Sequence, residues 1–238
     1  MKIWAISDTH MNHGTLTIPE ADMVIYAGDS TNYANIHDNQ KEFEIFIDWF
    51  RNLPFEHKIL IAGNHDAWAT KKYNVDFVLA QGIHYLEHDM ISIPTVDIPT
   101  SYMLNTDSDG IRIFGSPYTP TFGNWHFMKD RSKIGRYWDM IEESDRIDIL
   151  VTHGPPKGIL DLSADKKHQL EYCGDNALLK MVKRIKPKYH IFGHIHDNSE
   201  AMNAGHFIRD GINFMNVSCV TDGKFVMGCS SNGIVFEI

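Results

Sequence analysis

Acidic, amide and imidazole side chains recur in five short blocks, each placed where an apolar run of the sequence ends. The blocks are Asp8-Thr9-His10, Gly28-Asp29, Gly63-Asn64-His65-Asp66, Thr152-His153 and Gly193-His194-Ile195-His196. Their oxygen and nitrogen atoms are hard and borderline ligands that suit divalent cations. A single D-x-H or H-x-H pair arises by chance in many proteins, whereas five blocks in one order are hard to obtain by accident. The pattern predicts a site that holds two divalent cations side by side.

Taken one at a time, these residues have plainer explanations. Asp8 alone would be a loop-capping aspartate, Asn64 alone a turn residue, and His153 alone a partly buried histidine. The joint occurrence of the blocks outweighs these interpretations. Most of the other histidines have no partner pattern and are expected at the surface or in packing: His37, His57, His84, His88, His168, His190 and His206. His13, three residues after His10, stays open as a residue that faces the site.

Strands and helices alternate in the part of the chain that carries the blocks. Strands are predicted over 2–6, 23–27, 57–62, 111–115, 147–152 and 189–192, short β-like pieces over 84–98, and an irregular stretch over 116–127. Helices are predicted over 40–53, 71–81 and 175–186. In the first helix Phe43, Phe46, Ile47 and Phe50 form one apolar stripe at helical spacing.

The ends of these elements also have sequence signals. Asn39 and Glu42 form a capping-box pattern at the start of the first helix, and Pro54 ends that helix. The tail over 205–238 is predicted to be a β-meander. Its turns are expected at Asp210-Gly211, Asp222-Gly223 and Asn232-Gly233.

Strands that alternate with helices and then give way to hairpins predict an α/β fold with two packed sheets and helices outside. We expect a single domain over residues 1–238. The blocks follow the carboxyl ends of strands, where open α/β sheets place their binding sites.

Composition narrows the classes of function. The chain has 238 residues, 43% of them hydrophobic, which is ordinary for a globular protein, and its net charge of −9 argues against binding to nucleic acid. No segment approaches the length of a membrane span. The three cysteines form no CxxC pair, which fits reduced thiols in the cytoplasm. The ligand types favour Mn, Fe, Zn, Co or Ni over a thiolate-bound zinc.

The order and spacing of the blocks resemble the calcineurin-like metallophosphoesterase superfamily, whose pattern is D-x-H, G-D, G-N-H-[DE], H and G-H-x-H. Within it the chain is most similar to the MPPED-like class III cyclic nucleotide phosphodiesterases. That resemblance rests on the segments 53–55, 61–65, 115–120, 152–156 and 192–196 and covers nearly the whole chain, most weakly over 94–109. It implies a four-layer α/β/β/α sandwich of two mixed β-sheets flanked by helices. It also implies two divalent metal ions, Mn first by family habit.

The resemblance implies a role for each block. Asp29 would bridge the two metals, a role that a carboxylate suits because each oxygen can bind one cation. Asp8, His10 and His196 would bind the first metal, and Asn64, His153 and His194 the second. A hydroxide shared by the metals would attack phosphorus. His65 would then protonate the leaving oxygen, and Asp66 would hold the other ring nitrogen of His65.

The implied activity is hydrolysis of small phosphodiesters, cyclic nucleotides among them. The aromatic stretch over 118–127 is a candidate substrate loop in which Trp125 or Phe122 stacks on a nucleobase or aryl group. The plainer alternative is a self-packed loop. Other open functions are a phosphomonoesterase or protein phosphatase with the same metal core and, from a different class, a catalytically weak interaction scaffold. The phosphatase hypothesis is weakened because no arginine lies between Arg51 and Arg112.

One departure from the superfamily pattern concerns the residues after Asp29. Ser30-Thr31-Asn32-Tyr33 stands where an apolar residue is common. The sequence leaves open whether Ser30 or Asn32 reaches the site.

Overall fold

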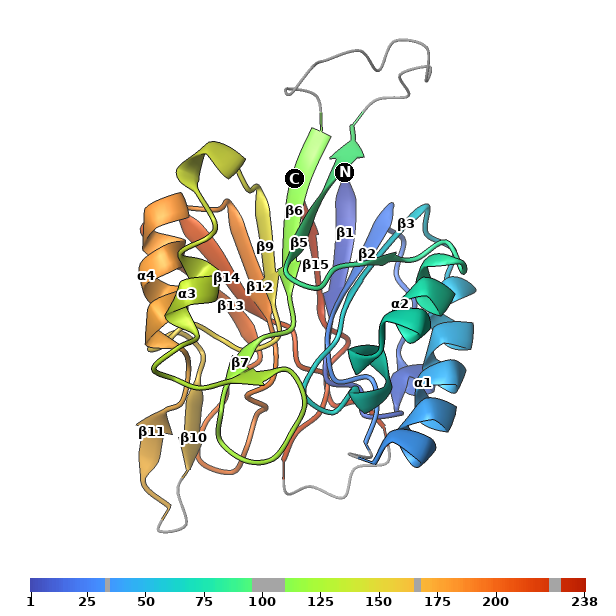
Figure 1. Cartoon of the computed structure of the whole chain (residues 1–238), viewed down its shortest axis with the longest axis horizontal. Helices are drawn as coiled ribbons and strands as arrows, with labels where there is room; N and C mark the ends of the chain where they lie inside the picture. The colour runs from blue at the N-terminus through green and yellow to red at the C-terminus, as the bar shows by residue number, and fades with distance from the viewer. Residues whose placement is uncertain (33–34, 96–109, 165–167, 223–227) are drawn as a thin grey trace.

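The fold is built on two mixed β-sheets (Figure 1). The computed structural model describes residues 1–32, 35–95, 110–164, 168–222 and 228–238 of the chain. The strands are β1 (Lys2–Ile6), β2 (Met23–Ala27), β3 (His57–Ile61), β4 (His84–Tyr85), β5 (Asp89–Pro94), β6 (Gly110–Ser116), β7 (Thr119–Pro120), β8 (Met128–Lys129), β9 (Ile149–Thr152), β10 (Leu162–Ala164), β11 (Leu170–Tyr172), β12 (Tyr189–Phe192), β13 (Gly205–Arg209), β14 (Ile212–Asn216) and β15 (Ile234–Glu237). The helices are α1 (Ile36–Arg51), α2 (Lys72–Leu79), α3 (Gly135–Trp138) and α4 (Asn176–Ile185), with 3-10 turns at His13–Thr15, Ala67–Thr70 and Glu143–Asp145.

The first sheet has the strand order β15-β1-β2-β3-β4, and the second has the order β13-β14-β12-β9-β6-β5. In the first sheet β1 to β4 run parallel and β15 is antiparallel. In the second sheet β14, β12, β9 and β6 run parallel, while β13 and β5 are antiparallel edge strands. The parallel strands therefore deliver several carboxyl ends to the same side of the molecule, which is the lower side in Figure 1.

The two sheets pack face to face, and each carries helices on its outer face (Figure 1). Along β1, Ile3 and Ala5 enter the core between the sheets, whereas Trp4 and Ile6 belong to the core under α1. This alternation follows from the period of two of a strand. The core under α4 joins Phe192 of β12 to side chains of that helix. The expected four-layer α/β/β/α sandwich is thus confirmed.

Helix α1 begins earlier than the sequence pattern indicated. Its N-terminal cap is Asn35, whose side chain accepts a hydrogen bond from the backbone of Asp38. The prediction of Asn39 as the cap was wrong, because its side chain has a tertiary role. The buried Asn39 amide donates to the carbonyl of His65 at 2.7 Å and accepts from the backbone of Trp68 at 2.7 Å.

The tail is not the meander that was expected. β13 and β14 form a hairpin with the predicted turn at Asp210-Gly211, where the backbone is left-handed, with φ of 53° and 79°. β15 instead crosses to the other sheet and pairs with β1. The prediction failed here because strand periodicity contains no information on which sheet accepts the strand. Of the predicted turn at 222–223, residue 223 lies outside the described residues, as do 96–98 of the predicted β pieces.

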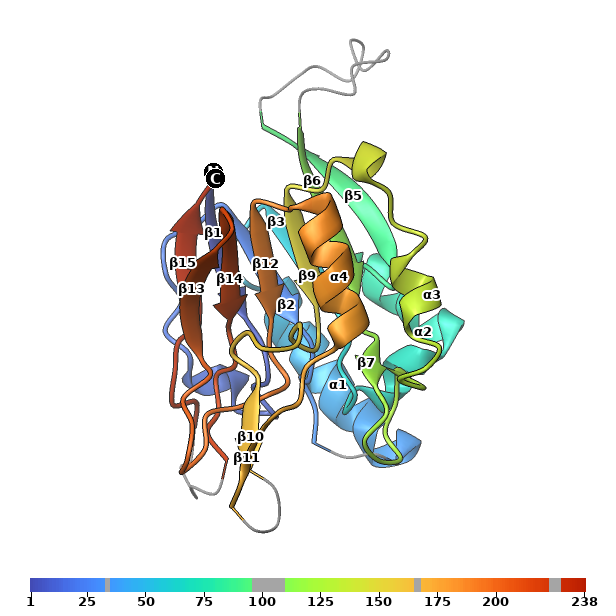
Figure 2. The ribbon, with the colours of Figure 1, turned by 90° about the vertical axis from the view of Figure 1, so that its left-hand side faces the viewer.

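The irregular stretch over 116–127 contains β7, which pairs with β8. The elements α3, β10 and β11 carried too few residues to give a sequence pattern. β10 and β11 form a small hairpin that projects at the lower end of the molecule and precedes α4 in sequence (Figure 2).

None of the helices in the described part of the chain has the length and apolar character that a membrane span requires.

Candidate metal centre

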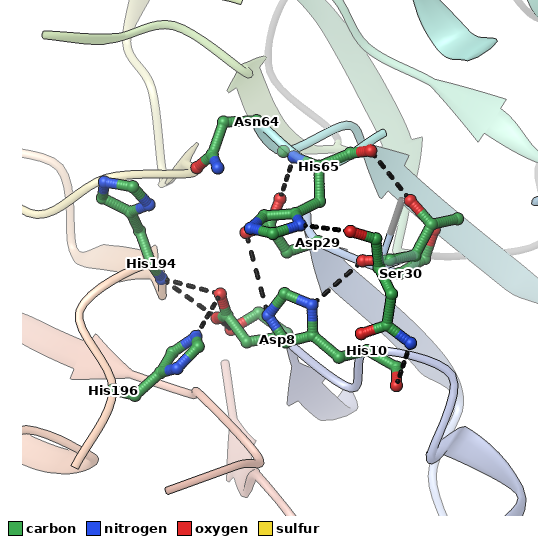
Figure 3. A network of polar contacts seen from close by, with 12 residues as sticks. Asp8, His10, Asp29, Ser30, Asn64, His65, His194 and His196 are labelled. Carbon is green, nitrogen blue, oxygen red and sulfur yellow. Dashed lines mark hydrogen bonds and ion pairs between the residues drawn. The ribbon is translucent and has the colours of Figure 1, made fainter. Parts of the chain in front are cut away.

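The predicted ligand residues lie on loops that follow the carboxyl ends of five parallel strands, β1, β2, β3, β9 and β12. Segments distant in sequence are joined directly at these ends. The backbone of Asp8 donates to the carbonyl of Gly28, and the backbone of Gly193 donates to that of His153, both at 2.9 Å. Figure 3 shows the side chains of Asp8, His10, Asp29, Asn64, His194 and His196 gathered around one space.

Asp8, His10 and His196 form the first donor group, with one ligand atom each and all of these atoms within 4.8 Å of one another. His196 Nε2 lies 3.1 Å from Asp8 Oδ1. Asp8 is fully buried, and its carboxylate also accepts from the backbone N–H of His194 at 3.0 and 3.1 Å. The carboxylate is therefore fixed before any cation binds.

Asp29, His153 and His194 form the second donor group, by the same distance criterion. His153 Nε2 lies 3.3 Å from Asp29 Oδ2 and 2.9 Å from Asn64 Oδ1. Asn64 thus brings an amide oxygen to the second group, as the pattern G-N-H predicted.

Asp29 links the two groups. Its Oδ2 lies 3.3 Å from His153 Nε2 and 3.9 Å from His10 Nε2, a residue of the first group. The other oxygen, Oδ1, accepts from the backbone N–H of His65 at 2.7 Å. Asp29 thus faces both groups with one oxygen, Oδ2, rather than with one oxygen for each group as expected.

The carboxylates and imidazoles of the site shift one another's pKa values. Burial disfavours the charged forms, but the neighbouring Asp29 carboxylate raises the pKa of His153 to about 9. Hydrogen bonds to Asp222 and Asp8 likewise outweigh burial and raise the pKa of His196 to about 10. Burial also opposes ionisation of Asp8 and Asp29, yet the histidines lower both carboxyl pKa values. His153 and His196 therefore offset part of the negative charge of Asp8, Asp29 and Asp222.

The other two histidines are held neutral. Burial lowers the pKa of His10, although Asp29 and Asp8 oppose this shift. Burial and the charge of His153 lower the pKa of His194 to about 3. His10 Nδ1 donates to the carbonyl of Thr31 at 2.9 Å, so Nε2 carries the lone pair. That Nε2 is buried without a hydrogen-bond partner. A buried lone pair beside two carboxylates fits a divalent cation, and the donor set as a whole suits a pair of them.

The backbone is strained where it carries these residues. Asp8, His10, Asp29 and His194 all have positive φ, between 42° and 70°. Such conformations cost about 1–3 kcal/mol each and concentrate at functional sites. Gly193 is required for a related reason, since a Cβ there would collide with the Asp8 carboxylate and with Ser7.

The expected pairing of Asp66 with the His65 ring is corrected by the structure. His65 Nδ1 donates instead to the carbonyl of Asn32 at 2.9 Å. The buried Asp66 carboxylate accepts from the backbone N–H of Gly63 and Asp29, at 2.8 and 3.0 Å. It also accepts from the backbone and side chains of Ser30 and Thr31. Asp66 is acceptor-only, so it serves the donor-rich loop after β2 rather than an imidazole N–H. Asn32 reaches the site through its backbone carbonyl and through its side-chain amide, which donates to the carbonyl of His10 at 3.1 Å. The Ser30 hydroxyl donates to Asp66.

The two aromatic candidates of the substrate loop flank the site in different ways. The Trp125 ring lies against His65, with centroids 4.2 Å apart and planes 32° apart. Phe122 lies 5.2 Å from the ring of His194, and its side chain is 57% exposed. Trp125 thus packs on His65, whereas Phe122 is largely exposed beside His194.

Two residues of the site were not found from the sequence. Asp222 accepts from His196 Nδ1 at 2.7 Å, and Thr31 anchors His10 as described. Asp222 was interpreted only as a turn residue, and no sequence signal distinguishes the two roles.

His13, whose position the sequence left open, packs against α1, with its ring 4.9 Å from that of Trp49. His190 is buried in packing, as expected.

Comparison with known proteins agrees with this fold and site. The chain belongs to the calcineurin-like phosphoesterase family, whose profile matches residues 1–198. Proteins of this family are metal-dependent phosphoester hydrolases, and this chain has the corresponding candidate metal ligands.

Among curated proteins, the chain is similar to the human metallophosphoesterase domain-containing protein 1. The two are 34% identical over 210 residues, which cover 84% of this chain and 62% of the human protein. A UPF0046 protein of Caenorhabditis elegans is 35% identical over 198 residues, which cover 80% of this chain and 67% of that protein. The chain thus spans about three-fifths to two-thirds of the length of these relatives.

Solved structures share the fold at low sequence identity. The Phosphopantetheinyl Hydrolase (PptH) from Mycobacterium tuberculosis superposes with a TM-score of 0.54 at 17% identity, over 91% of this chain and 88% of that one. The protein TT1561 of Thermus thermophilus superposes with a TM-score of 0.55 at 14% identity, over 90% of this chain and 88% of that one.

Proposed function

We propose that this protein is a cytoplasmic phosphodiesterase that hydrolyses small phosphodiesters, cyclic nucleotides among them, with two divalent cations. Asp8, His10 and His196 would hold one cation, and Asn64, His153 and His194 the other, with Asp29 shared. The observation that carries the proposal is the set of overlapping donor groups around Asp29. Asp29 shares one group with His153 and His194 and another with His10 and His65, and His10 also belongs to the group with Asp8 and His196. Mn is the proposed metal, and Fe, Zn, Co and Ni suit the same ligand types.

Bound cations would supply charge that polarises the phosphoryl oxygens and lowers the pKa of a nearby water. The chain's own residues supply orientation. The Ala27 carbonyl accepts from His153 Nδ1 at 2.9 Å, and Asn32 does the same for His65. Each ring therefore presents Nε2 to the site, which is the arrangement that outer hydrogen bonds give to metal-binding histidines.

His65 is the residue proposed to give a proton to the leaving oxygen. Its Nδ1 hydrogen is engaged by Asn32, its backbone N–H is held by Asp29, and Trp125 covers the ring. These contacts leave Nε2 as the ring atom that can reach a substrate. A proton donor placed in this way contributes about 10²–10⁴-fold to a rate.

Preference for a diester is supported by the charge of the wall near His65. A cavity of about 570 Å³ opens there and is lined by His10, Asn12, Asn32, His65, Thr221 and Asp222, among others. Among the described residues that line it there is no lysine or arginine. A monoester dianion would gain no additional cationic partner there, whereas a diester carries a single charge.

The test is hydrolysis by the manganese-reconstituted protein of bis(p-nitrophenyl) phosphate and of p-nitrophenyl phosphate. A panel with 2′,3′- and 3′,5′-cyclic nucleotides follows. We expect the diester to have the larger kcat/KM, by at least about tenfold, which corresponds to about 1.4 kcal/mol in transition-state free energy. Equal or faster turnover of the monoester would favour the phosphomonoesterase instead.

A further inference from the structure

Two cavities open from different sides of the metal centre. The cavity just described, here called the polar cavity, contains His10 and His65 in its wall. A second cavity of about 250 Å³, here called the apolar cavity, is lined by Pro120, Phe122, Pro155, Arg131 and His194, among others. His196 and Asp222 line both, so the cavities meet at the site. A phosphodiester has two substituents, and each cavity can take one of them.

The position of His65 decides which substituent departs. His65 lines the polar cavity and is not among the residues of the apolar cavity. In hydrolysis the bond from phosphorus to the departing oxygen breaks, and a bond to the oxygen of water forms. His65 gives its Nε2 proton to the departing alcohol and is reprotonated from solvent, while the water releases a proton to solvent. The departing alcohol therefore occupies the polar cavity, and the ester that stays on phosphorus occupies the apolar cavity.

The apolar cavity has the features of a site for a planar apolar group. Phe122 is 57% exposed and lies 5.2 Å from His194, so one of its faces is open at the junction with the metal centre. Pro120 and Pro155 provide further rigid apolar wall. Exposed aromatic surface of this kind gains from offset or edge contact with a planar group.

The same cavity contains a cation without an acidic partner. Arg131 donates to the carbonyls of Cys173 at 3.1 Å and Gly174 at 3.5 Å, contacts that fix its guanidinium at the cavity wall. No carboxylate among the described residues forms an ion pair with it. The chain as a whole carries a net charge of −9, so a fixed arginine at this position is a local exception. A guanidinium presents a planar fork that suits carboxylate or phosphate.

We infer that the apolar cavity selects phosphodiesters whose retained substituent is planar and apolar and carries an anionic group, bound by Phe122 and Arg131. This inference rests on the proposed diesterase activity for the direction of cleavage. Arg131 and Phe122 are thus specificity-determining residues, and the departing alcohol is not selected by them.

The experiment uses diesters that share a p-nitrophenolate leaving group and differ in the retained group, which is methyl, phenyl or 4-carboxyphenyl. For the manganese-loaded protein we expect kcat/KM to rise about tenfold from methyl to phenyl, as apolar burial in a pocket gives. It should rise a further fivefold or so from phenyl to 4-carboxyphenyl, the scale of a partly exposed ion pair. Phe122→Ala should abolish the preference for phenyl over methyl. Arg131→Gln should abolish the preference for 4-carboxyphenyl over phenyl.

The controls separate recognition from damage. Arg131→Lys retains the charge and should retain part of the carboxylate preference, and Arg209→Gln, at an exposed position of β13, should keep both preferences. A second readout is the affinity of the protein for 4-carboxyphenyl phosphate and for phenyl phosphate, each measured by calorimetry. Arg131→Gln should weaken only the former, about fivefold.

Each outcome has a distinct meaning. A carboxylate preference that persists in Arg131→Gln would reduce Arg131 to a support for the chain around Cys173 and overturn the inference. An equal loss for every substrate, methyl included, would place Arg131 on the phosphoryl group and also overturn it. If no diester is cleaved but 4-carboxyphenyl phosphate still binds through Arg131, the proposed diesterase fails while recognition by the apolar cavity stands.

Discussion

Four histidines of the site are anchored through the same ring atom. The Nδ1 partners are Thr31 for His10, Asn32 for His65, Ala27 for His153 and Asp222 for His196. Three of these partners are backbone carbonyls, which only accept, so Nδ1 carries the hydrogen and Nε2 is directed to the site. The ligand positions are therefore set by the backbone of neighbouring loops as well as by the ligands themselves.

At this scale the first prediction concerns His65. Replacement by alanine should lower kcat for a cyclic nucleotide by about 10²–10⁴, since the basic alkoxide that departs loses its proton donor, and should lower it less for a diester that releases p-nitrophenolate. Metal content should stay at the wild-type level, because the ligands of the two proposed cations remain. Turnover and elemental analysis on the same preparation check both parts. Near wild-type turnover would remove His65 from the reaction.

A second prediction at the residue scale concerns protons. The raised pKa values of His153 and His196, about 9 and about 10, mean that both are protonated at neutral pH without metal. A cation needs their lone pairs, so manganese binding should release protons. Calorimetry in buffers of different ionisation enthalpy measures this release. A binding enthalpy independent of the buffer would contradict the charge state described here.

The raised pKa values of His153 and His196 also determine in which direction the stability of the metal-free protein changes with pH. Both pKa values are raised above the unfolded value of about 6.5, so the stability they contribute is complete below that pH. It is lost as pH rises through 9 and 10. The metal-free protein should accordingly have a falling Tm as the pH rises from neutral to about 10, measured by scanning calorimetry, while the metal-loaded protein is less affected.

At the scale of elements, the Asp66 side chain of the loop after β3 accepts several of the hydrogen bonds that join this loop to the loop after β2. The buried Asp66 carboxylate accepts hydrogen bonds from Gly63, Asp29, Ser30 and Thr31. Asp29 carries the proposed bridging carboxylate, and Thr31 orients His10. Asp66 is therefore a positioning residue that sets the distance between these two loops.

Replacement of Asp66 by asparagine should destabilise the protein by about 2–4 kcal/mol. The amide cannot accept at its nitrogen, and donors that are buried there lose their partner. Urea denaturation of the metal-free variant measures the change, with the exposed Asp48→Asn as the matched control. We also expect weaker manganese binding, because Asp29 moves with its backbone. A change below about 0.5 kcal/mol, the range of ordinary surface substitutions, would contradict this role.

Elements with many residues in one pattern were predictable, and single tertiary contacts were not. The strands β1, β2, β3, β6, β9 and β12 follow from apolar runs, because both of their faces are buried. The helices α1, α2 and α4 follow from their length and apolar spacing, because one face of each helix packs on a sheet. The cap at Asn35 was missed because Asn39 fits the same local pattern. The sheet to which β15 belongs was missed because pairing with β1 depends on contacts that are distant in sequence.

In the site, too, the residues of a repeated pattern were predictable and single tertiary contacts were not. The blocks come together because parallel strands deliver their carboxyl ends to one side, so strand order and block order suffice to gather the ligands. The partners of their outer nitrogens did not follow from sequence, since three are carbonyls that any residue can offer. Asp222 and Arg131 had no motif around them and required coordinates.

β12 carries a buried histidine that is not one of the proposed metal ligands. His190 lies on the side of α4, its Nε2 donates to Thr152 at 2.8 Å, and its Nδ1 has no hydrogen-bond partner. Burial lowers the pKa of His190 to about 3. The unfolded chain therefore binds more protons, and stability falls as pH drops from about 6.5 toward 3.

Replacement of His190 by phenylalanine should remove this part of the acid sensitivity. Wild type should lose about 1.4 kcal/mol per pH unit below about pH 6.5 through this group, and the variant should lose correspondingly less. Urea denaturation over a pH series from neutral down to about 5 measures the slope. His206→Phe, at an exposed position of β13, should keep the wild-type slope. An unchanged slope in His190→Phe would mean that His190 takes up a proton in the folded protein as readily as in the unfolded chain.

For the whole molecule, the two sheets bring one half of the site each. β1, β2 and β3 supply Asp8, His10, Asp29 and Asn64, while β9 and β12 supply His153, His194 and His196. The donor groups therefore depend on the packing of sheet on sheet, which the shared core between them fixes. The ends of the chain lie far from this centre, at the upper end of the sheets (Figure 1).

The most direct test of the two-cation centre is anomalous diffraction from crystals grown with manganese. We expect two peaks, one among Asp8, His10 and His196 and the other among Asn64, His153 and His194, with the Asp29 carboxylate between them. A crystal of metal-supplemented protein with no peak at these residues, or with Asp29 bound to neither ion, would contradict the account.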